Sequence, residues 1–342
     1  MVGHRIRQQC LALVATWLAA VVPAAAQQPA APGFVAPPRT ISDITAILDQ
    51  QKPDPAAVAK LRELADAKPP EGASPADLVD FLFRRGMAAE QLGRAVQKRA
   101  DMKESVRIGR GAGVNTLQSV FQWAEVENRL GNQRLANQLY EERLAMVLAA
   151  NSQGNLPAAY SNLAAAYVRA GDLVRAHDYA EKAAKVVNDE LSNNRNWSLV
   201  NENWRAQVER ARALIAMAEG RYTEAEQFQR EAVALSEKTV EKAPMLSQLG
   251  VGNQAIYENF REVNIFDLAA ILEKQRRLVE AEVEARRALL SQLKRRGKYA
   301  SETANGVSNL GRILSSQGRA AEAQKLFEVA AEIYRETGAE QS

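Results

Sequence analysis

The sequence predicts an all-α fold assembled from repeated helical hairpins. The clearest copy is the stretch 309–331, in which apolar residues recur at helical spacing on both sides of Gly318. The second stripe carries small residues on the face that must approach the first helix, and Gly318 supplies the backbone freedom that a tight turn requires. The same offsets recur around five further positions, namely Gly93, Gly131, Gly171, Gly220 and Arg276. Six matching copies are a strong signal of the fold.

These offsets resemble those of the tetratricopeptide repeat. In that family a large apolar residue, a small residue and a second large residue precede the turn glycine, and Ala, an aromatic residue and Ala follow it. The last copy matches this pattern with Leu310, Gly311, Leu314, Ala323, Phe327 and Ala330. The resemblance implies a right-handed α-solenoid, in which each hairpin stacks on its neighbours. The anchors lie 38 to 56 residues apart, against a family period of about 34, so we expect longer helices or inserted loops.

Three places depart from the repeat pattern. Arg276 stands where the turn glycine is usual, although the residues around it fit. Lys98 occupies a small-residue position of the first copy, which weakens the prediction of a second helix there. In the longest interval, Ala243-Pro244 predicts a helix stop and the segment 250–252 predicts a loop.

Residues 1–26 have the features of a secretory signal peptide. Arg5 and Arg7 precede an apolar run from Cys10 to about Val22, and three alanines at 24–26 provide a cleavage position. The run is short for a membrane span, so an uncleaved anchor is the less favoured alternative. We therefore expect a protein that begins near Gln27 and is periplasmic or secreted. The Pro- and Ala-rich residues 27–39 predict a disordered linker.

Cleavage would change the charge and the cysteine content. The chain has 44 basic and 41 acidic residues, and the signal peptide holds two arginines and no acid. The remainder would carry a net charge of +1, which gives no reason to expect a nucleic-acid partner. The single cysteine would be lost, so no disulfide framework is expected. Loss of the apolar run also predicts that the protein is not stably inserted in a membrane.

Residues 40–73 predict a short helical cap ahead of the solenoid, for which we expect the bounds 74–338. Thr40 to Asp43 has the pattern of a capping box. Asp54-Pro55 and Ser74-Pro75 each combine an N-cap residue with proline in the first helical turn. Such a cap would cover the apolar edge of the first repeat.

The segments DITAILDQQKPDPAAVAKLRELADAKPP and FLFRRGMAAEQLGR, within residues 42–94, resemble the leaders of exported bacterial tetratricopeptide proteins. In some of these proteins the repeats precede a caspase-like CHAT protease domain, which uses a His/Cys pair. Because the chain ends at Ser342 and its cysteine belongs to the predicted signal peptide, we expect no such domain here. The resemblance implies an alternative function, a regulatory module of a CHAT-type protease system that is detached from the protease or acts in trans.

The residues for catalysis or metal binding are scarce. After cleavage His177 would be the remaining histidine, in a helical context typical of a partly exposed side chain. We therefore predict no enzyme, no cofactor and no metal site. The basic run from Lys294 to Lys298 is expected to be a solvated helix end. Trp123, Trp197 and Trp204 are expected to pack in the core.

The remaining candidate is the inner groove that the resemblance implies, lined by the first helix of each hairpin. Asn162 and Asn309 occupy the same repeat position, where the family often uses an amide to bind the backbone of an extended peptide. Further polar candidates for this groove are Gln122, Arg84, Arg169 and Arg312. The alternative is that they are ordinary polar residues on a wet surface. The predicted function is thus a non-catalytic scaffold or adaptor with a protein or peptide ligand.

The end of the array gives one further expectation. The last predicted helix carries Leu326, Ile333 and Tyr334, and few residues follow it. An uncovered apolar face usually marks an interface. We therefore expect a homo-oligomer through the C-terminal end, or a partner chain that covers it.

Overall fold

The computed structural model describes residues 36–51, 54–191, 199–250 and 252–337. The predicted signal peptide, most of the predicted linker, Trp197 and Val251 lie outside these ranges. All the described residues belong to one structural unit, and they form helices and turns without a strand. The predicted all-α class is confirmed.

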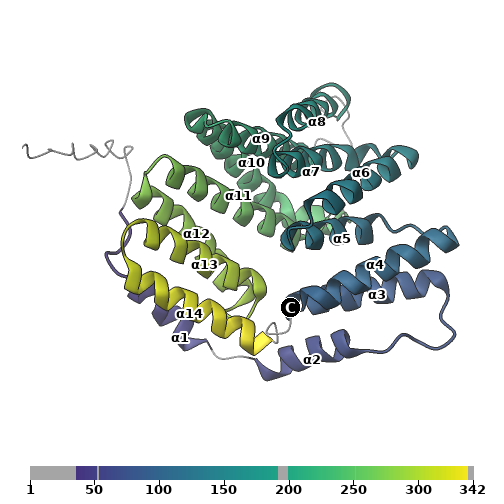
Figure 1. The fold of residues 1–342 in the computed structure, drawn as a ribbon, viewed down its shortest axis with the longest axis horizontal. Helices are drawn as coiled ribbons and strands as arrows, with labels where there is room; N and C mark the ends of the chain where they lie inside the picture. Colours follow the sequence, from purple (N-terminus) through teal and green to yellow (C-terminus); the bar gives the residue numbers. More distant parts are fainter. Residues whose placement is uncertain (1–35, 52–53, 192–198, 251, 338–342) are drawn as a thin grey trace, which may run out of the picture. The chain divides into compact units, whose positions relative to one another are not determined.

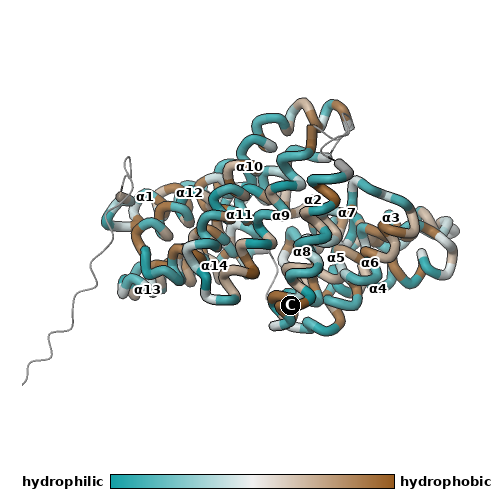
Figure 2. Tube along the Cα trace, turned by 90° about the horizontal axis from the view of Figure 1, so that it is seen from above, coloured by the Kyte–Doolittle hydropathy of each residue, from teal (hydrophilic) through white to brown (hydrophobic). Residues whose placement is uncertain are grey.

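Six consecutive hairpins form the array (Figure 1). Their helices are α3 (Pro75–Gln91) with α4 (Ala95–Ala112), α5 (Leu117–Arg129) with α6 (Gln133–Ala149), α7 (Leu156–Arg169) with α8 (Leu173–Lys185), α9 (Asn201–Ala218) with α10 (Tyr222–Gln248), α11 (Gln254–Lys274) with α12 (Leu278–Arg296), and α13 (Ser301–Ser316) with α14 (Ala320–Thr337). A short 3-10 turn, η1 (Gln153–Asn155), leads into α7, and a π-helical turn, η2 (Val186–Leu191), extends α8. Figure 2 shows apolar and hydrophilic stretches alternating along the helices, as expected where one face of each helix is buried.

The six hairpins turn at the six predicted anchors. The five anchor glycines have φ between +71° and +81°, and Arg276 has φ +64°. This left-handed region is open to glycine and strained for other residues. Arg276 therefore adopts the backbone conformation that glycine supplies in the other five turns.

The first hairpin has a complete second helix. The inference that Lys98 weakens the prediction of this helix was wrong. Helix α4 runs for 18 residues, and the Lys98 side chain is fully buried within it. Its ammonium lies 2.7 Å from a carboxylate oxygen of Glu90 and 2.7 Å from Oε1 of Gln122. A buried cation with these partners replaces the small residue without leaving an unpaired charge.

The predicted stop at Ala243-Pro244 is also wrong. Pro244 lies inside α10, which continues to Gln248. Ala243 and Leu246, on either side of the proline, are fully buried. This packing holds the last turns of the helix although proline removes one backbone hydrogen bond. The loop follows instead at Gly250 and Gly252, which both have positive φ.

The two N-terminal helices pack at different ends of the array. Helix α2 (Pro55–Asp66) begins at the predicted N-cap, where Asp54 Oδ1 accepts hydrogen bonds from two backbone amides at 2.9 and 3.1 Å. Its buried Ala65 shares an apolar cluster with Ala89 and Leu92 of the first hairpin. Helix α1 (Ser42–Gln50) lies instead beside the last two hairpins (Figure 1). The expected cap on the first repeat is therefore formed by α2 alone.

Helix α1 is held by a set of polar contacts that we call the seam, between residues 40–51 and Arg286, Lys298 and Glu322. Arg286 Nη1 donates to both Asp43 carboxylate oxygens at 2.8 Å, and Nη2 donates to Thr40 O at 2.9 Å. The Ile41 amide donates to Glu322 Oε1 at 3.0 Å, and the Lys298 amide donates to Gln51 Oε1 at 2.5 Å. The predicted capping box does not form, because its Asp43 is bound to Arg286 and α1 has no side-chain cap.

The C-terminal face is covered by the chain itself, so the expected uncovered face was wrong. Leu326 and Ile333 are fully buried in the same apolar cluster as Ile44 and Leu48 of α1. The Tyr334 hydroxyl donates to Asn305 Oδ1 at 2.8 Å. With Leu326 and Ile333 covered, the reason to expect a homo-oligomer at this end is removed.

The sequence predicted that the basic run from Lys294 to Lys298 is a solvated helix end, and this prediction is wrong. Arg295 pairs with the buried Glu262 at 2.5 Å, and Arg296 pairs with Glu302 at 2.5 Å. Lys298 is buried and pairs with Glu332 at 2.7 Å. Arg295 and Arg296 therefore hold α12 to its neighbours, and Lys298 holds the residues after α12 to α14. In the part of the chain that the structure describes, no helix has both the length and the apolar character to cross a membrane.

Candidate functional site

A cavity of about 240 Å³ lies among the first helices of the second to fifth hairpins. Four helices contribute to its wall, α5, α7, α9 and α11, and Arg143 reaches it from α6. Its position follows from the packing, because the first helices of the third and fourth hairpins contact each other directly. We call it the inner cavity and define it by the lining residues Gln118, Phe121, Arg143, Ala158, Ser161, Asn162, Ala165, Asn203, Gln207, Arg210, Ala211, Ile256, Tyr257 and Phe260.

The wall combines aromatic and aliphatic side chains. Phe121, Tyr257 and Phe260 come from α5 and α11, and Ile256 lies beside the latter two. Ile256 is 64% exposed although it is a large apolar residue. Seven of the fourteen lining residues are apolar or aromatic and seven are polar, so the cavity offers both kinds of contact to a ligand.

The polar groups of the cavity include two buried side chains with unsatisfied atoms. Arg143 is 5% exposed, and its Nε and Nη1 have no hydrogen-bond partner among the described residues. The hydroxyl of the buried Ser161 likewise has none in this part of the chain. Buried polar groups in native proteins are nearly always hydrogen-bonded, so these three atoms require an explanation.

The electrostatics of Arg143 are set by its burial and its neighbours. The guanidinium carbon lies 4.8 Å from the centroid of the Phe121 ring. Burial lowers the pKa of Arg143, and the nearby Tyr140 and Glu125 oppose this effect. An arginine nevertheless stays protonated in proteins. The Glu125 carboxylate is already bound by the Tyr140 hydroxyl.

The second arginine of the cavity is paired. Arg210 Nε donates to Asp267 Oδ2 at 2.7 Å. Among the residues that line the cavity there is no Asp or Glu. The positive charge of Arg143 therefore faces a space whose lining residues carry no carboxylate.

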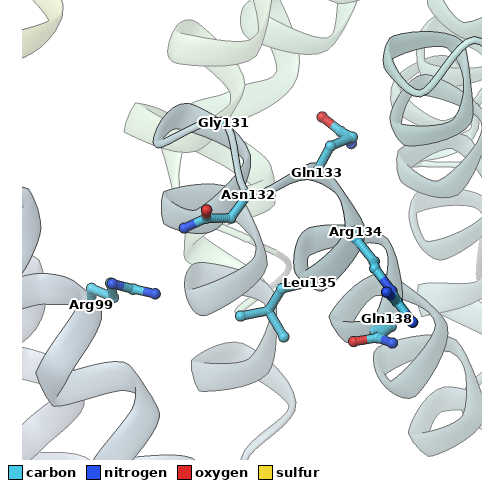
Figure 3. Close-up of a pocket in the computed structure, with 7 residues that line it drawn as sticks. All are labelled: Arg99, Gly131, Asn132, Gln133, Arg134, Leu135 and Gln138. Atoms are coloured by element: carbon cyan, nitrogen blue, oxygen red, sulfur yellow. The ribbon is translucent and has the colours of Figure 1, made fainter.

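A second, more open depression lies at the turn between α5 and α6 and is lined by Arg99, Gly131, Asn132, Gln133, Arg134, Leu135 and Gln138 (Figure 3). Several of its polar groups already have partners. Arg99 Nε and Asn132 Nδ2 both donate to the buried Glu127, at 2.5 and 2.6 Å. Gln133 donates to Asn137 at 2.8 Å. This depression therefore offers fewer free groups to a ligand than the inner cavity.

The six predicted groove residues are spread over the array. Asn162 lines the inner cavity, and Asn309 is half-buried on α13 outside its lining. Gln122 accepts the Lys98 hydrogen bond, so its amide oxygen is already used. The other three are exposed, and among them Arg84 pairs with Asp80 and Arg312 pairs with Glu273, whereas Arg169 lies at the end of α7. The structure brings one predicted residue, Asn162, to the cavity.

The sequence reasoning missed Arg143 and Ser161. Ser161 immediately precedes Asn162, but its burial depends on packing that the repeat pattern does not specify. Arg143 had a detectable signal, because it lies 12 residues after Gly131, where the repeat pattern has a small residue. The corresponding residues of the other hairpins are Ser105, Ala183, Ala232, Ala288 and Ala330.

The other residues considered in the sequence have structural contacts. His177 is partly exposed, and its Nε2 lies 2.8 Å from Glu219 Oε1 of the next hairpin. Trp123 and Trp204 are buried, as predicted for core residues. No group of three or more His, Cys, Asp or Glu side chains suited to a metal ion occurs in the described ranges.

Two models of the tetratricopeptide repeat family match the sequence. One covers residues 261–336, the fifth and sixth hairpins, and the other covers 158–190 and 211–243, the third and fourth hairpins. The chain is a tetratricopeptide repeat protein. In this tetratricopeptide repeat protein the first two hairpins lie outside the matched residues, yet both have the turn glycine with positive φ. A search of curated proteins found no match.

Comparison with solved structures found several chains that are similar to this tetratricopeptide repeat protein. NprR in complex with its cognate peptide NprX is 15% identical, with a TM-score of 0.54 over 86% of this chain and 72% of that chain. BtubC (BKLC) from P. vanneervenii is 18% identical, with a TM-score of 0.43 over 73% and 91%. A putative kinesin light chain with TPR-like repeats from Podosopora anserina is 21% identical, with a TM-score of 0.40 over 65% and 96%. The NprR match supports the helical-repeat fold.

Proposed function

We propose that this tetratricopeptide repeat protein is a non-catalytic scaffold or adaptor that binds a protein or peptide segment in the inner cavity. The observation that carries the proposal is the composition of this cavity. Four successive first helices line it, two of them contribute aromatic residues, and Arg143 and Ser161 present unsatisfied polar atoms there. An extended segment can offer both apolar side chains and hydrogen-bonding groups to such a surface.

The likeness to NprR gives independent support. That protein was solved with its cognate peptide and shares the helical-repeat fold with this chain. A fold of this type exposes the first helices of several repeats to one ligand. We extend the peptide-binding role to this chain as part of the proposal.

We place this activity in the cell envelope, as a periplasmic or secreted protein. The support is the sequence of residues 1–26, with its charged start, apolar run and three alanines. Mass spectrometry of the native protein tests this part, and we expect a mature N-terminus at or near Gln27. Intact residues 1–26 on a cytoplasmic protein would contradict it.

A display library of random dodecapeptides tests the binding function. We expect the purified protein to enrich a family of sequences, whose affinity is then measured by fluorescence anisotropy with synthetic peptides. Ile256→Asp places a charge on the cavity wall and should weaken binding about tenfold or more, because it removes apolar contact area. Val174→Asp is the matched control, since Val174 is 82% exposed and lies on α8 outside the cavity lining.

The outcomes separate the alternatives. Failure to enrich any sequence, or an equal loss of affinity in both variants, would count against the inner cavity as the binding site. Affinity capture from the cell envelope then identifies the natural partner. Recovery of a CHAT-type protease by the wild type, but not by Ile256→Asp, would support the regulatory alternative.

A further inference from the structure

Arg143 occupies a position where the other five hairpins carry a small residue. At the corresponding positions, Ser105, Ala183, Ala232, Ala288 and Ala330 are all buried. A small side chain there lets the second helix approach its neighbours. The second hairpin has a long cationic side chain in this place, and that side chain lines the inner cavity.

The burial of Arg143 has a cost that no hydrogen bond to Nε or Nη1 from the described chain offsets. A guanidinium removed from water needs hydrogen-bonded partners, and burying an unpaired charge is strongly unfavourable. The other buried cation at a small-residue position, Lys98, has two partners at 2.7 Å. The contrast indicates that the missing partner of Arg143 comes from outside the described chain.

The geometry restricts the chemistry of that partner. The two unsatisfied atoms, Nε and Nη1, are cationic donors on different edges of the guanidinium, and each can donate a charge-assisted hydrogen bond to a carboxylate oxygen. The Phe121 ring lies near the guanidinium, and the Ser161 hydroxyl is a further unsatisfied group in the same cavity. The volume of about 240 Å³ corresponds to about eight water molecules, enough for a carboxylate and a neighbouring apolar group.

We propose that Arg143, with Ser161, forms a carboxylate subsite of the inner cavity, which binds an acidic side chain or a C-terminal carboxylate of the ligand segment. The inference rests on the proposed function and specifies the chemistry of its ligand. The apolar wall of Phe121, Ile256 and Phe260 contacts the residues next to that carboxylate.

The subsite is tested first without a peptide. Sodium acetate is titrated into the purified protein at constant ionic strength, with sodium chloride as the reference and sodium phosphate as a second anion. The arginine Nε–Hε resonances are followed by NMR, and we expect a saturable shift of Arg143 with acetate. Arg169 is the control, because it is exposed on α7 and lies outside the cavity lining. No shift of Arg143 with acetate, or a saturable shift with phosphate alone, would overturn the carboxylate subsite.

The second arm uses the peptides enriched by the display library. Each is made with a free or an amidated C-terminus, and with each Asp or Glu replaced by Asn or Gln. We expect one of these neutralisations to weaken binding to the wild type at least tenfold, and the sensitive one identifies the source of the carboxylate. Arg143→Met should abolish this preference. Arg143→Lys, which keeps the charge on a single nitrogen, should retain part of it, and Arg169→Met should keep all of it.

The results distinguish the two proposals. If acetate shifts Arg143 but no peptide binds, the carboxylate subsite stands and the peptide-binding function fails. If peptides bind equally well in all charged and neutral forms, the subsite is overturned and the function stands. If Arg143→Met fails to fold, the acetate titration of the wild type and the Arg143→Lys variant still decide the question.

Discussion

The seam and the inner cavity each bury an arginine to 5% exposure, but they surround it differently. In the seam, Arg286 donates to Asp43, to the Thr40 carbonyl and, from Nε at 2.8 Å, to the buried Glu282. In the cavity, Arg143 has two nitrogen atoms without a partner among the described residues. Burial alone therefore does not reveal the role of a cation. Its partners do, and they indicate that Arg286 stabilises the fold while Arg143 is available to a ligand.

The largest expected effect is on the seam. Arg286→Met should lower the free energy of unfolding by about 3 kcal/mol, because it leaves the buried Glu282 with less compensation and releases Asp43 from α12. Urea denaturation followed by circular dichroism measures this change. We also expect faster amide hydrogen exchange in α1, since the hydrogen bonds from Arg286 that hold it to α12 are lost.

Arg143→Met is the matched variant in the cavity. It replaces an equally buried arginine by the same side chain, but it leaves no buried carboxylate that was bound to the guanidinium. We expect the free energy of unfolding to stay within about 1 kcal/mol of the wild type, or to rise. A loss as large as that of Arg286→Met would remove the distinction between the two sites.

A smaller effect, on peptide affinity, is expected to differ between Asn162 and Asn309, which occupy the same repeat position. Both were predicted to bind a peptide backbone, but only Asn162 lines the inner cavity. Asn162→Ala should weaken the binding of an enriched peptide by about 1 kcal/mol, the typical contribution of one hydrogen bond. Asn309→Ala should leave the affinity unchanged. Anisotropy titrations of both variants measure this, and equal losses would show that the ligand also contacts α13.

Acid should lower the contribution of the seam to the free energy of unfolding by at most about 1 kcal/mol, because Glu322 is partly exposed to solvent. Its pKa is held below the usual value of about 4.3, first by the hydrogen bonds from Arg319 and further by the Ile41 amide. A lowered pKa means that the ionised carboxylate stabilises the fold above this usual value, and that the stabilisation is lost as the pH falls through the lowered pKa. Urea denaturation between pH 7 and pH 3 should show the difference between wild type and Glu322→Gln shrinking with acid. A constant difference would contradict this assignment.

The smallest effect is expected at the turn that joins the two regions, since α11 lines the cavity and α12 carries Arg286. Arg276→Gly relieves the strain of φ +64° and should stabilise the protein by about 0.5 kcal/mol, after the greater flexibility of glycine in the unfolded chain is counted. Gly318→Ala is the converse control and should destabilise it by about 1 kcal/mol, because a Cβ there meets no atom within 4 Å and only the backbone is strained. Thermal unfolding of both variants tests the pair.

The sequence by itself determined the hairpins and their turns. Apolar periodicity and small residues act within about 40 residues, so each anchor could be placed, including Arg276 in the absence of glycine. The N-caps at Asp54 and Ser74 were equally local, because each side chain accepts from amides two or three residues ahead. Ser161 lies next to the predicted Asn162, and Arg143 departs from the small residue of the repeat pattern. Both features can be seen in the sequence, but the burial of the two side chains cannot.

The tertiary structure alone decided which distant groups meet. Arg286 and Asp43 are 243 residues apart, and no local pattern predicts that α1 covers Leu326 and Ile333 rather than the first hairpin. The same holds for the inner cavity, whose wall comes from four helices of different hairpins. Repeat periodicity specifies contacts between neighbours, whereas the seam and the cavity depend on how the rotations between successive hairpins accumulate along the array.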